Sequence, residues 1–384
     1  MTLPAWRTAM AAYEVIALPA SNTLADLNPK NNASLNPNYP GNPEWWGGTG
    51  FTAVIGTWCG AACDTDHDEV WWADEGGHGD YGGNEVMKLA LNQATPAYAL
   101  VRAPSGAIGN LLTTNDGQES TGVYSDGRTR STHTYNKHVY VPGVGPMKGV
   151  QGKCYQSAAS GTAKPILYNR STGEPTLLTN AHPDGLAVES GEAAAFDPTR
   201  GTQGSIWVRY PGTAKFARYD VAAGTWTSVG SSTAPGPGEV SMCCHPDGAY
   251  ALLAKNPYPI SGAPSSAATF KVVDLSNGTI YAPTFSGSVA GNLRRGFTQW
   301  RWVPSLGVFA GWDNSTDTNT VTFLTPGADP FTDTWTISTQ AFTGDTVSAR
   351  ASNGTFGRWC YFPNLDGFFV VNSVSEAGYF FALS

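Results

Sequence analysis

Charged residues are few in this chain. Asp, Glu, Lys and Arg together make up 14% of its 384 residues, against about a quarter in an average soluble domain. Their sum is a net charge of −8 at pH 7. Nucleic-acid binding depends on Lys and Arg meeting phosphates, so we expect no nucleic-acid partner. No run approaches the roughly 20 apolar residues of a membrane-spanning helix, so we expect no membrane insertion.

Cysteine is sparse and lacks the spacing of a metal site. The six cysteines are Cys59, Cys63, Cys154, Cys243, Cys244 and Cys360. Zinc sites use paired Cys or His units at short spacing, and no CxxC pair occurs here. We therefore expect buried thiols, no metal and no cofactor. The acidic run at 64–68 imitates a calcium loop, but Glu69 stands where the sharp-turn glycine should be.

A secretory signal pattern is also missing. The first 20 residues contain one Arg and a short apolar run that Glu14 interrupts, which is typical of mature protein. The composition nevertheless resembles that of extracellular proteins. A phage virion component that is released by lysis fits both observations. A cytoplasmic protein, which fits the missing signal, is the alternative.

Glycine, proline and aromatic residues are abundant: 45 Gly, 26 Pro and 13 Trp, with aromatics at 12% of the chain. This mixture favours many short strands and turns over helices. We find no long stretch with apolar residues at helical spacing. The composition therefore predicts an all-β protein.

One pattern recurs along the chain: an apolar strand, a turn with Pro or Asp, and a second strand soon after a Gly. Clear copies are AAAFDPTRGTQGSIWV (193–208), SMCCHPDGAYALL (241–253), QWRWVPSLGVFAGW (299–312) and RWCYFPNLDGFFVV (358–371). Looser copies occupy 60–72 and 132–142. When the copies are aligned with one another, the same position of the repeat is occupied by Asp64, Asp197, His245, Val303 and Phe362. We call this the register position.

A second hairpin follows each copy except the last. Its clearest examples are RYDVAAGTWTSV and VVDLSNGTIYAP, and the equivalent residues Trp226, Ile280 and Trp335 lie 54 and 55 positions apart. Four strands at this period are the sequence signature of a β-propeller blade.

The sixth copy ends after three strands, and AAYEVIALP (11–19) resembles the missing outer strand. Pairing of the two termini in one blade would remove the free edge of the ring. We therefore predict one propeller domain over 1–384 with six blades; seven is the alternative count. The predicted parts are the closing strand 11–19, an Asn/Pro-rich crossover 20–47, and blades at about 48–103, 130–180, 190–232, 238–284, 296–342 and 356–384.

The YD…GTW hairpins and the loop GGHGDYGGNEV (76–86) resemble Kelch-type propellers of the galactose-oxidase-like class. This resemblance implies a propeller fold, and such propellers serve as enzymes, lectin-like binders and scaffolds alike. Copper chemistry of the galactose-oxidase kind would need further metal ligands, and the sequence offers no matching set.

The Gly-rich loop is absent from the other five copies, so the fold does not require it. In a propeller its face also receives the crossovers between blades. The candidate ligand-binding residues that we expect there are Trp45, Trp46, His78, Asp80, Tyr81, Asn84, Arg128, Arg130, His133, Lys153, Tyr155, Arg294 and Arg295. Aromatic rings suit sugars, and Arg and Lys suit uronate or sulfate groups. This set predicts an anionic glycan ligand.

Catalysis is the alternative for the same face. A His can abstract the proton beside a uronate carboxylate while a Tyr protonates the leaving oxygen. His78 or His133 would be the base and Tyr81 or Tyr155 the acid, and this set is similar in residue types to propeller-fold ulvan lyases. The structural alternative is that His78 binds backbone within its own loop and that Asp80 and Asn84 cap turns.

These observations favour a non-catalytic recognition or structural propeller, a virion protein of a phage tail, collar or fibre that binds cell-surface glycan and contacts other virion proteins. A polysaccharide lyase that cleaves an anionic glycan is the alternative. A Kelch-type scaffold for protein interactions is the second alternative, and only the missing signal peptide favours it.

Overall fold

The computed structural model describes residues 2–29, 49–77, 80–105, 127–148, 165–178, 193–209, 216–230, 240–256 and 269–384. Helices are short in these ranges: α1 (Ala5–Thr8), α2 (Ala53–Gly56) and the 3-10 helices η1 (Leu24–Leu27) and η3 (Gly50–Thr52) span a single turn each. No helix in the described ranges has the length and apolar character needed to cross a membrane.

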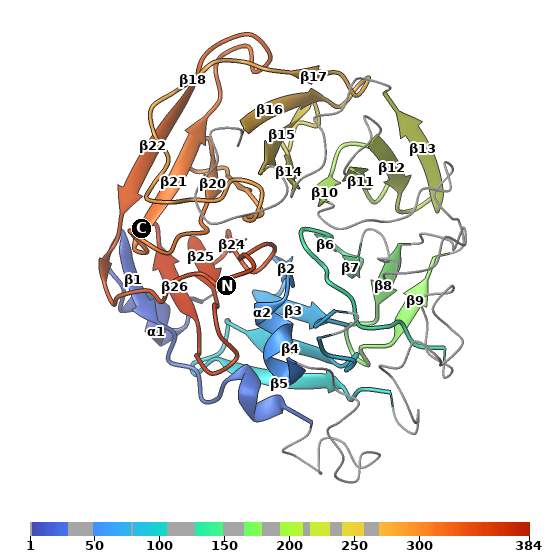
Figure 1. Ribbon diagram of the computed structural model, residues 1–384, viewed down its shortest axis with the longest axis vertical. Coiled ribbons are helices and arrows are strands. Elements are labelled where there is room, and N and C mark those ends of the chain that lie inside the picture. The colour runs from blue at the N-terminus through green and yellow to red at the C-terminus, as the bar shows by residue number, and fades with distance from the viewer. Residues whose placement is uncertain are drawn as a thin grey trace.

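Six small sheets stand around a central axis, and each is one blade of a propeller (Figure 1). In the first four blades, four antiparallel strands follow the chain from the axis to the rim. Blade one holds β2 (Ala62–Asp64), β3 (Glu69–Ala73), β4 (Val86–Ala90) and β5 (Ala97–Arg102). Blade two holds β6 (His138–Val141), β7 (Gly145–Lys148), β8 (Ile166–Tyr168) and β9 (Pro175–Leu177). Blade three holds β10 (Ala193–Asp197), β11 (Ser205–Arg209), β12 (Phe216–Asp220) and β13 (Thr225–Val229). Blade four holds β14 (Val240–Cys244), β15 (Tyr250–Lys255), β16 (Thr269–Asp274) and β17 (Ile280–Tyr281).

The last two blades have a fifth, parallel strand at the rim. Blade five holds β19 (Arg301–Val303), β20 (Val308–Gly311), β21 (Thr320–Thr325) and β22 (Trp335–Ala341), with β18 (Phe285–Ser286) parallel to β22. Blade six holds β24 (Cys360–Phe362), β25 (Gly367–Val370), β26 (Tyr379–Ala382), β1 (Glu14–Ala17) and β23 (Thr343–Gly344). These short edge strands lengthen the outer rim.

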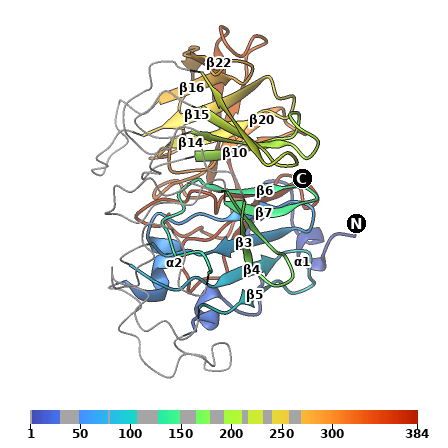
Figure 2. The same cartoon turned by 90° about the vertical axis from the view of Figure 1, so that its right-hand side faces the viewer.

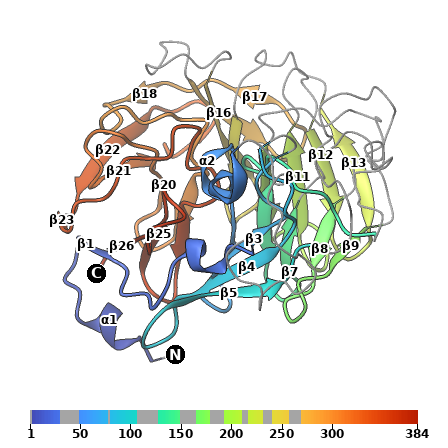
Figure 3. The ribbon, with the colours of Figure 1, turned by 60° about the horizontal axis from the view of Figure 1, so that its bottom comes forward.

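Both termini build blade six, as predicted. Strand β1 pairs antiparallel with β26, with Val15 opposite Phe381 and Ile16 opposite Phe380, and Figure 3 shows the two side by side. The six-blade count and the closing N-terminal strand are therefore confirmed. Because β1 pairs with β26, the last strand of the chain is not left as an unpaired edge of its blade.

The core lies between blades. Trp207 of blade three packs with Met242 and Leu253 of blade four, and all three side chains are buried. Because each inner sheet is covered on both faces, all five residues of β11 are buried, whereas every residue of rim strand β13 has some exposure. This explains why inner strands read as continuous apolar runs in the sequence.

A disulfide joins the first and last blades. Cys63 on β2 bonds Cys360 on β24, with Cα atoms 5.5 Å apart although the residues are 297 positions apart in the chain. The expectation of buried thiols was wrong for this pair, because ring closure brings distant cysteines together and spacing does not reveal it. Cys59, Cys243 and Cys244 are free thiols, and Cys154 lies outside the described residues.

The ring has two distinct faces. Turns between the first and second strands of each blade emerge on the face that carries α1, which we call the turn face. Loops between second and third strands, and crossovers between blades, emerge on the face that carries α2, which we call the crossover face. Figure 2 shows α1 and α2 on opposite sides of the ring.

Candidate functional site

Eight of the thirteen predicted site residues lie in the described part of the chain. The five outside it are Trp45, Trp46, His78, Lys153 and Tyr155. The other eight come from loops and crossovers of the crossover face, and their surroundings differ widely.

Asp80 and His133 are brought together. The imidazole Nε2 of His133 lies 3.0 Å from Asp80 Oδ2, which joins the Gly-rich loop of blade one to the crossover that enters blade two. The second carboxylate oxygen of Asp80 accepts a hydrogen bond from the Thr49 hydroxyl at 2.9 Å. The ring of Trp58 lies 5.2 Å from the His133 ring. This pair is partly exposed, with 11% of the His133 side chain and 29% of the Asp80 side chain open to solvent.

Tyr81 and Asn84 are fully buried. The Tyr81 hydroxyl donates to Glu85 at 2.8 Å, and the Asn84 amide donates to Ser105 and to the Thr129 carbonyl. Burial raises the pKa of Glu85 to about 7, although the Tyr81 hydrogen bond opposes the rise. With no exposed surface, Tyr81 and Asn84 hold the loop in place. This geometry argues against the predicted roles of Tyr81 as ligand contact or acid and of Asn84 as ligand contact.

The predicted arginines are engaged within the protein. Arg128 pairs with Glu174 at 2.6 Å, and Arg294 pairs with Asp313 at 2.7 Å. Arg295 lies over the ring of Phe270 at 4.9 Å. Arg130 is buried, with 4% of its surface exposed. Because paired charges attract a ligand weakly, Arg128 and Arg294 are poor candidates for the predicted preference of the crossover face for anions.

Four aromatic rings meet at the crossover end of the central channel. In blade two, Val141 fills the register position, because it precedes Pro142 as four of the other register residues precede their prolines. The four aromatic residues stand six residues before the register position in blades one, two, five and six: Trp58, Tyr135, Phe297 and Phe356. The Tyr135 and Phe356 rings are 5.6 Å apart, and those of Phe297 and Phe356 are 5.2 Å apart. Because Tyr135 belongs to blade two and Phe356 to blade six, this contact spans the axis. We call the four residues the aromatic plug.

Three plug residues have left-handed backbone. The φ angles are 52° at Trp58, 47° at Tyr135 and 49° at Phe356. Such angles cost about 1–3 kcal/mol for a bulky residue and persist only where surrounding packing enforces them. The buried contacts of Tyr135, Phe297 and Phe356 supply that packing.

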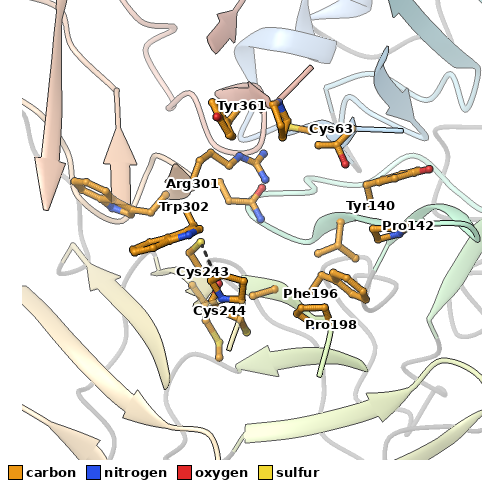
Figure 4. A pocket seen from close by; sticks show the side chains of 18 of the residues that line it. Cys63, Tyr140, Pro142, Phe196, Pro198, Cys243, Cys244, Arg301, Trp302 and Tyr361 are labelled. Atoms are coloured by element: carbon orange, nitrogen blue, oxygen red, sulfur yellow. Dashed lines mark hydrogen bonds between the residues drawn. The ribbon is translucent and has the colours of Figure 1, made fainter. Parts of the chain in front are cut away.

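The opposite end of the channel is open. A pocket of about 320 Å³ lies on the axis at the turn face, where the inner strands of all six blades end (Figure 4). We call it the axial pocket. Residues directly before the register position line it with aromatic rings: Tyr140, Phe196, Trp302 and Tyr361. Residues directly after that position line it with prolines: Pro142, Pro198, Pro246, Pro304 and Pro363. Proline suits these positions because it lacks an N–H and ends each inner strand.

The axial pocket has two notable polar groups. Arg301 donates from Nε to the Trp359 carbonyl at 2.7 Å and from Nη2 to the Gly357 carbonyl at 3.0 Å. Burial lowers the pKa of Arg301 to about 10, so the guanidinium is still charged at neutral pH. Gln299 donates to the Ala194 carbonyl at 3.2 Å, and its Oε1 is buried with no hydrogen-bond partner among the described residues.

The thiols of the axial pocket are poorly suited to catalysis. Burial raises the pKa of Cys243 to about 11 and raises the pKa of Cys244 well above its usual value. Because the thiolate is the nucleophile, both groups are inert at neutral pH. Across the described ranges, no three His, Cys, Asp or Glu side chains are grouped to hold a metal ion.

Sequence reasoning missed the axial pocket, although its signal was visible. The repeats 193–208, 241–253, 299–312 and 358–371 each show a proline directly after the register position. Three of them show an aromatic residue directly before it. Positions that recur in every blade converge on the axis of a propeller, so this pattern could have predicted an aromatic ring around the channel.

No family model matches the sequence, and no curated protein matches it either. Solved structures that are similar to this chain at low sequence identity do exist. An auxiliary nutrient binding protein from Bacteroides ovatus is 15% identical, with 97% of this chain and 77% of that chain covered and a TM-score of 0.48. The allergen Mala s 1 from Malassezia sympodialis is 11% identical, with 86% and 93% covered and a TM-score of 0.44. An auxiliary nutrient binding protein from Bacteroides thetaiotaomicron is 12% identical, with 84% and 69% covered and a TM-score of 0.38.

These likenesses are too distant to say what the chain binds, and the propeller assignment rests on its own strand pairing. The Kelch subtype and the similarity to ulvan lyases stay predictions.

Proposed function

We propose that this propeller is a non-catalytic recognition protein that binds a glycan. One sugar residue of the glycan would occupy the axial pocket. The observation that carries the proposal is the composition of the pocket wall, which contains four aromatic side chains and five prolines. Ligand pockets are mostly apolar concavities of about 300–1,000 Å³ with a few placed polar groups, and this pocket lies at the small end of that range. Its size favours a terminal sugar over a passing polymer.

A non-catalytic role is supported by the groups around both channel ends. Tyr81, one of two predicted acids, is buried on Glu85, and the pocket thiols are protonated. The lyase remains the second candidate because Asp80 lies against His133. A hydrogen bond between a carboxylate and an imidazole holds the ring in one orientation, which a general base requires.

The test is binding measured on a glycan array and then by calorimetry with the glycans that the array selects. Trp302→Ala removes a pocket wall, and we expect affinity to fall by more than about tenfold, as for a buried aromatic contact. Trp226→Ala, on rim strand β13, is the matched control and should bind as the unaltered protein does. Equal affinity for the two variants would contradict the proposed site.

The same samples test the lyase. Incubation with uronate polysaccharides and absorbance for unsaturated products would reveal turnover. Steady product formation that His133→Ala abolishes would overturn the non-catalytic assignment. Absence of product, alongside binding that Trp302→Ala removes, would overturn the lyase.

We further propose that the protein is part of a phage particle, in a tail, collar or fibre, and contacts other virion proteins there. The disulfide between Cys63 and Cys360 supports a location outside the reducing cytoplasm, where such bonds persist. Mass spectrometry of purified particles tests this location. Recovery of the protein only from the cytoplasm of uninfected cells would contradict it and favour the scaffold.

A further inference from the structure

Arg301 is a charged group without a counter-ion. Two of its nitrogens are used by the Trp359 and Gly357 carbonyls, and no carboxylate in the described ranges pairs with it. Figure 4 shows its side chain in the wall of the axial pocket, toward the side where Cys63 and Tyr361 lie. Partly buried charges are normally paired, so a cation left unpaired beside a cavity indicates an anionic ligand.

Three carboxylates on the turns around the axial pocket are engaged by groups other than Arg301. Asp64 pairs with Arg170 at 2.8 Å, and Asp197 pairs with Arg200 at 2.6 Å. Asp66 accepts hydrogen bonds from the Tyr140 hydroxyl at 2.6 Å and from the Gly143 amide at 2.8 Å. Each of these acids therefore has its own donors, and Arg301 keeps an uncompensated positive charge.

Gln299 supplies a hydrogen-bond acceptor close to the Arg301 donors. Its side chain is 3% exposed, and its Oε1 has no hydrogen-bond partner among the described residues. A buried amide oxygen without a donor costs about 1–3 kcal/mol, which a ligand hydroxyl can recover. Gln299 stands two residues before Arg301, the first residue of β19, and both line the axial pocket.

We infer that the axial pocket selects a sugar that bears a carboxylate, with the acid group on the Arg301 guanidinium and a sugar hydroxyl donating to Gln299. This inference rests on the proposed glycan recognition and adds the chemical class of the bound residue. The aromatic wall would hold the ring, and Arg301 would decide between acidic and neutral sugars. Under this inference the turn face distinguishes acidic from neutral sugars. The sequence predicted this role for the crossover face.

Three probes of nearly the same shape test the inference: galacturonate, its methyl ester and galactose. Calorimetry on the unaltered protein should show galacturonate binding about ten- to a hundredfold more tightly than either neutral probe, because a charged hydrogen bond is lost with the charge. This comparison needs no variant. Equal binding of all three would overturn the inference and leave glycan recognition standing.

Two variants locate the effect. Arg301→Gln should abolish the preference, so that galacturonate and galactose bind with equal affinity. Arg301→Lys keeps the charge and should retain part of the preference. Arg128→Gln, which removes a crossover-face arginine paired with Glu174, is the matched control and should leave the preference intact.

Each alternative result has a distinct meaning. A preference for galacturonate that survives Arg301→Gln but disappears in Arg128→Gln would overturn the inference and return charge selection to the crossover face. Tight galactose binding with weak galacturonate binding would also overturn it while supporting a glycan site. Failure of all sugars, on the array and in solution, would overturn the proposed function itself.

Discussion

The two ends of the central channel both carry aromatic residues from the blade repeats but have opposite properties. At the crossover end, four aromatic side chains pack together across the axis. At the turn end, four aromatic side chains stand back from the axis and leave a pocket of about 320 Å³. Aromatic residues therefore indicate the channel of this propeller, but whether they fill it or line it depends on their distance from the register position.

Charge separates the two ends in the same way. Crossover-face arginines such as Arg128 and Arg294 meet carboxylates, whereas Arg301 at the turn end meets only backbone carbonyls. A count of arginines on one face is thus a poor guide to anion binding. An arginine that lacks a carboxylate partner among the described residues and also lines a pocket, as Arg301 does, is the better guide.

The largest effect that we expect comes from the aromatic plug. Phe356→Ala removes a ring that is 0% exposed and touches Tyr135 and Phe297. Truncation of a buried Phe costs about 3–5 kcal/mol, so the free energy of unfolding should fall by that amount in urea titrations. Trp302→Ala, at the end with the pocket, should lower the free energy of unfolding less than Phe356→Ala does. It should lower the affinity for glycan more. The reverse ranking would break the distinction between a filled end and a lined end.

Glu85 beneath the crossover face should make stability depend on pH. Burial raises its pKa from 4.5 to about 7 in the folded protein, so the folded state holds a proton that the unfolded chain releases. Its stabilising effect is complete below about pH 4.5 and is lost as pH rises through about 7. At about 1.4 kcal/mol per unit, the loss approaches roughly 3 kcal/mol.

Unfolding free energies at pH 5 and pH 8 measure this effect. Glu85→Gln keeps an oxygen for the Tyr81 hydroxyl and should remove most of the difference between the two pH values. A difference that persists in this variant would place the titrating group elsewhere.

The smallest effect should come from the partly exposed pair on the crossover face. Asp80→Asn should cost at most about 1 kcal/mol, because exposed ion pairs contribute little. It should leave glycan affinity unchanged, since Asp80 and His133 lie on the face opposite the axial pocket. Loss of binding in this variant, with Trp302→Ala unaffected, would return the site to the face that the sequence favoured.

The repeat pattern was sufficient for the architecture. The recurrence of the register position, the spacing of the second hairpins and the match of 11–19 to a missing strand predicted six blades and their closure. Strand pairing confirms both. Such features depend on local alternation and on period, which a single sequence displays.

The candidate site was less predictable for physical reasons. The sequence placed Asp80 and His133 on one face, but it could not show that Tyr81 is buried or that Arg294 meets Asp313. Burial and pairing depend on neighbours that are distant in the chain.

By itself, then, the sequence determined the number of blades, their order and the residue types that each blade directs toward the axis. Tertiary structure alone decided which end of the channel holds a pocket, which cysteines bond and that the arginine beside the pocket meets backbone carbonyls and no carboxylate of the described ranges. The reason is that the first set follows from patterns within one blade. The second set depends on contacts between blades, such as Cys63 with Cys360, that exist only after the ring has closed.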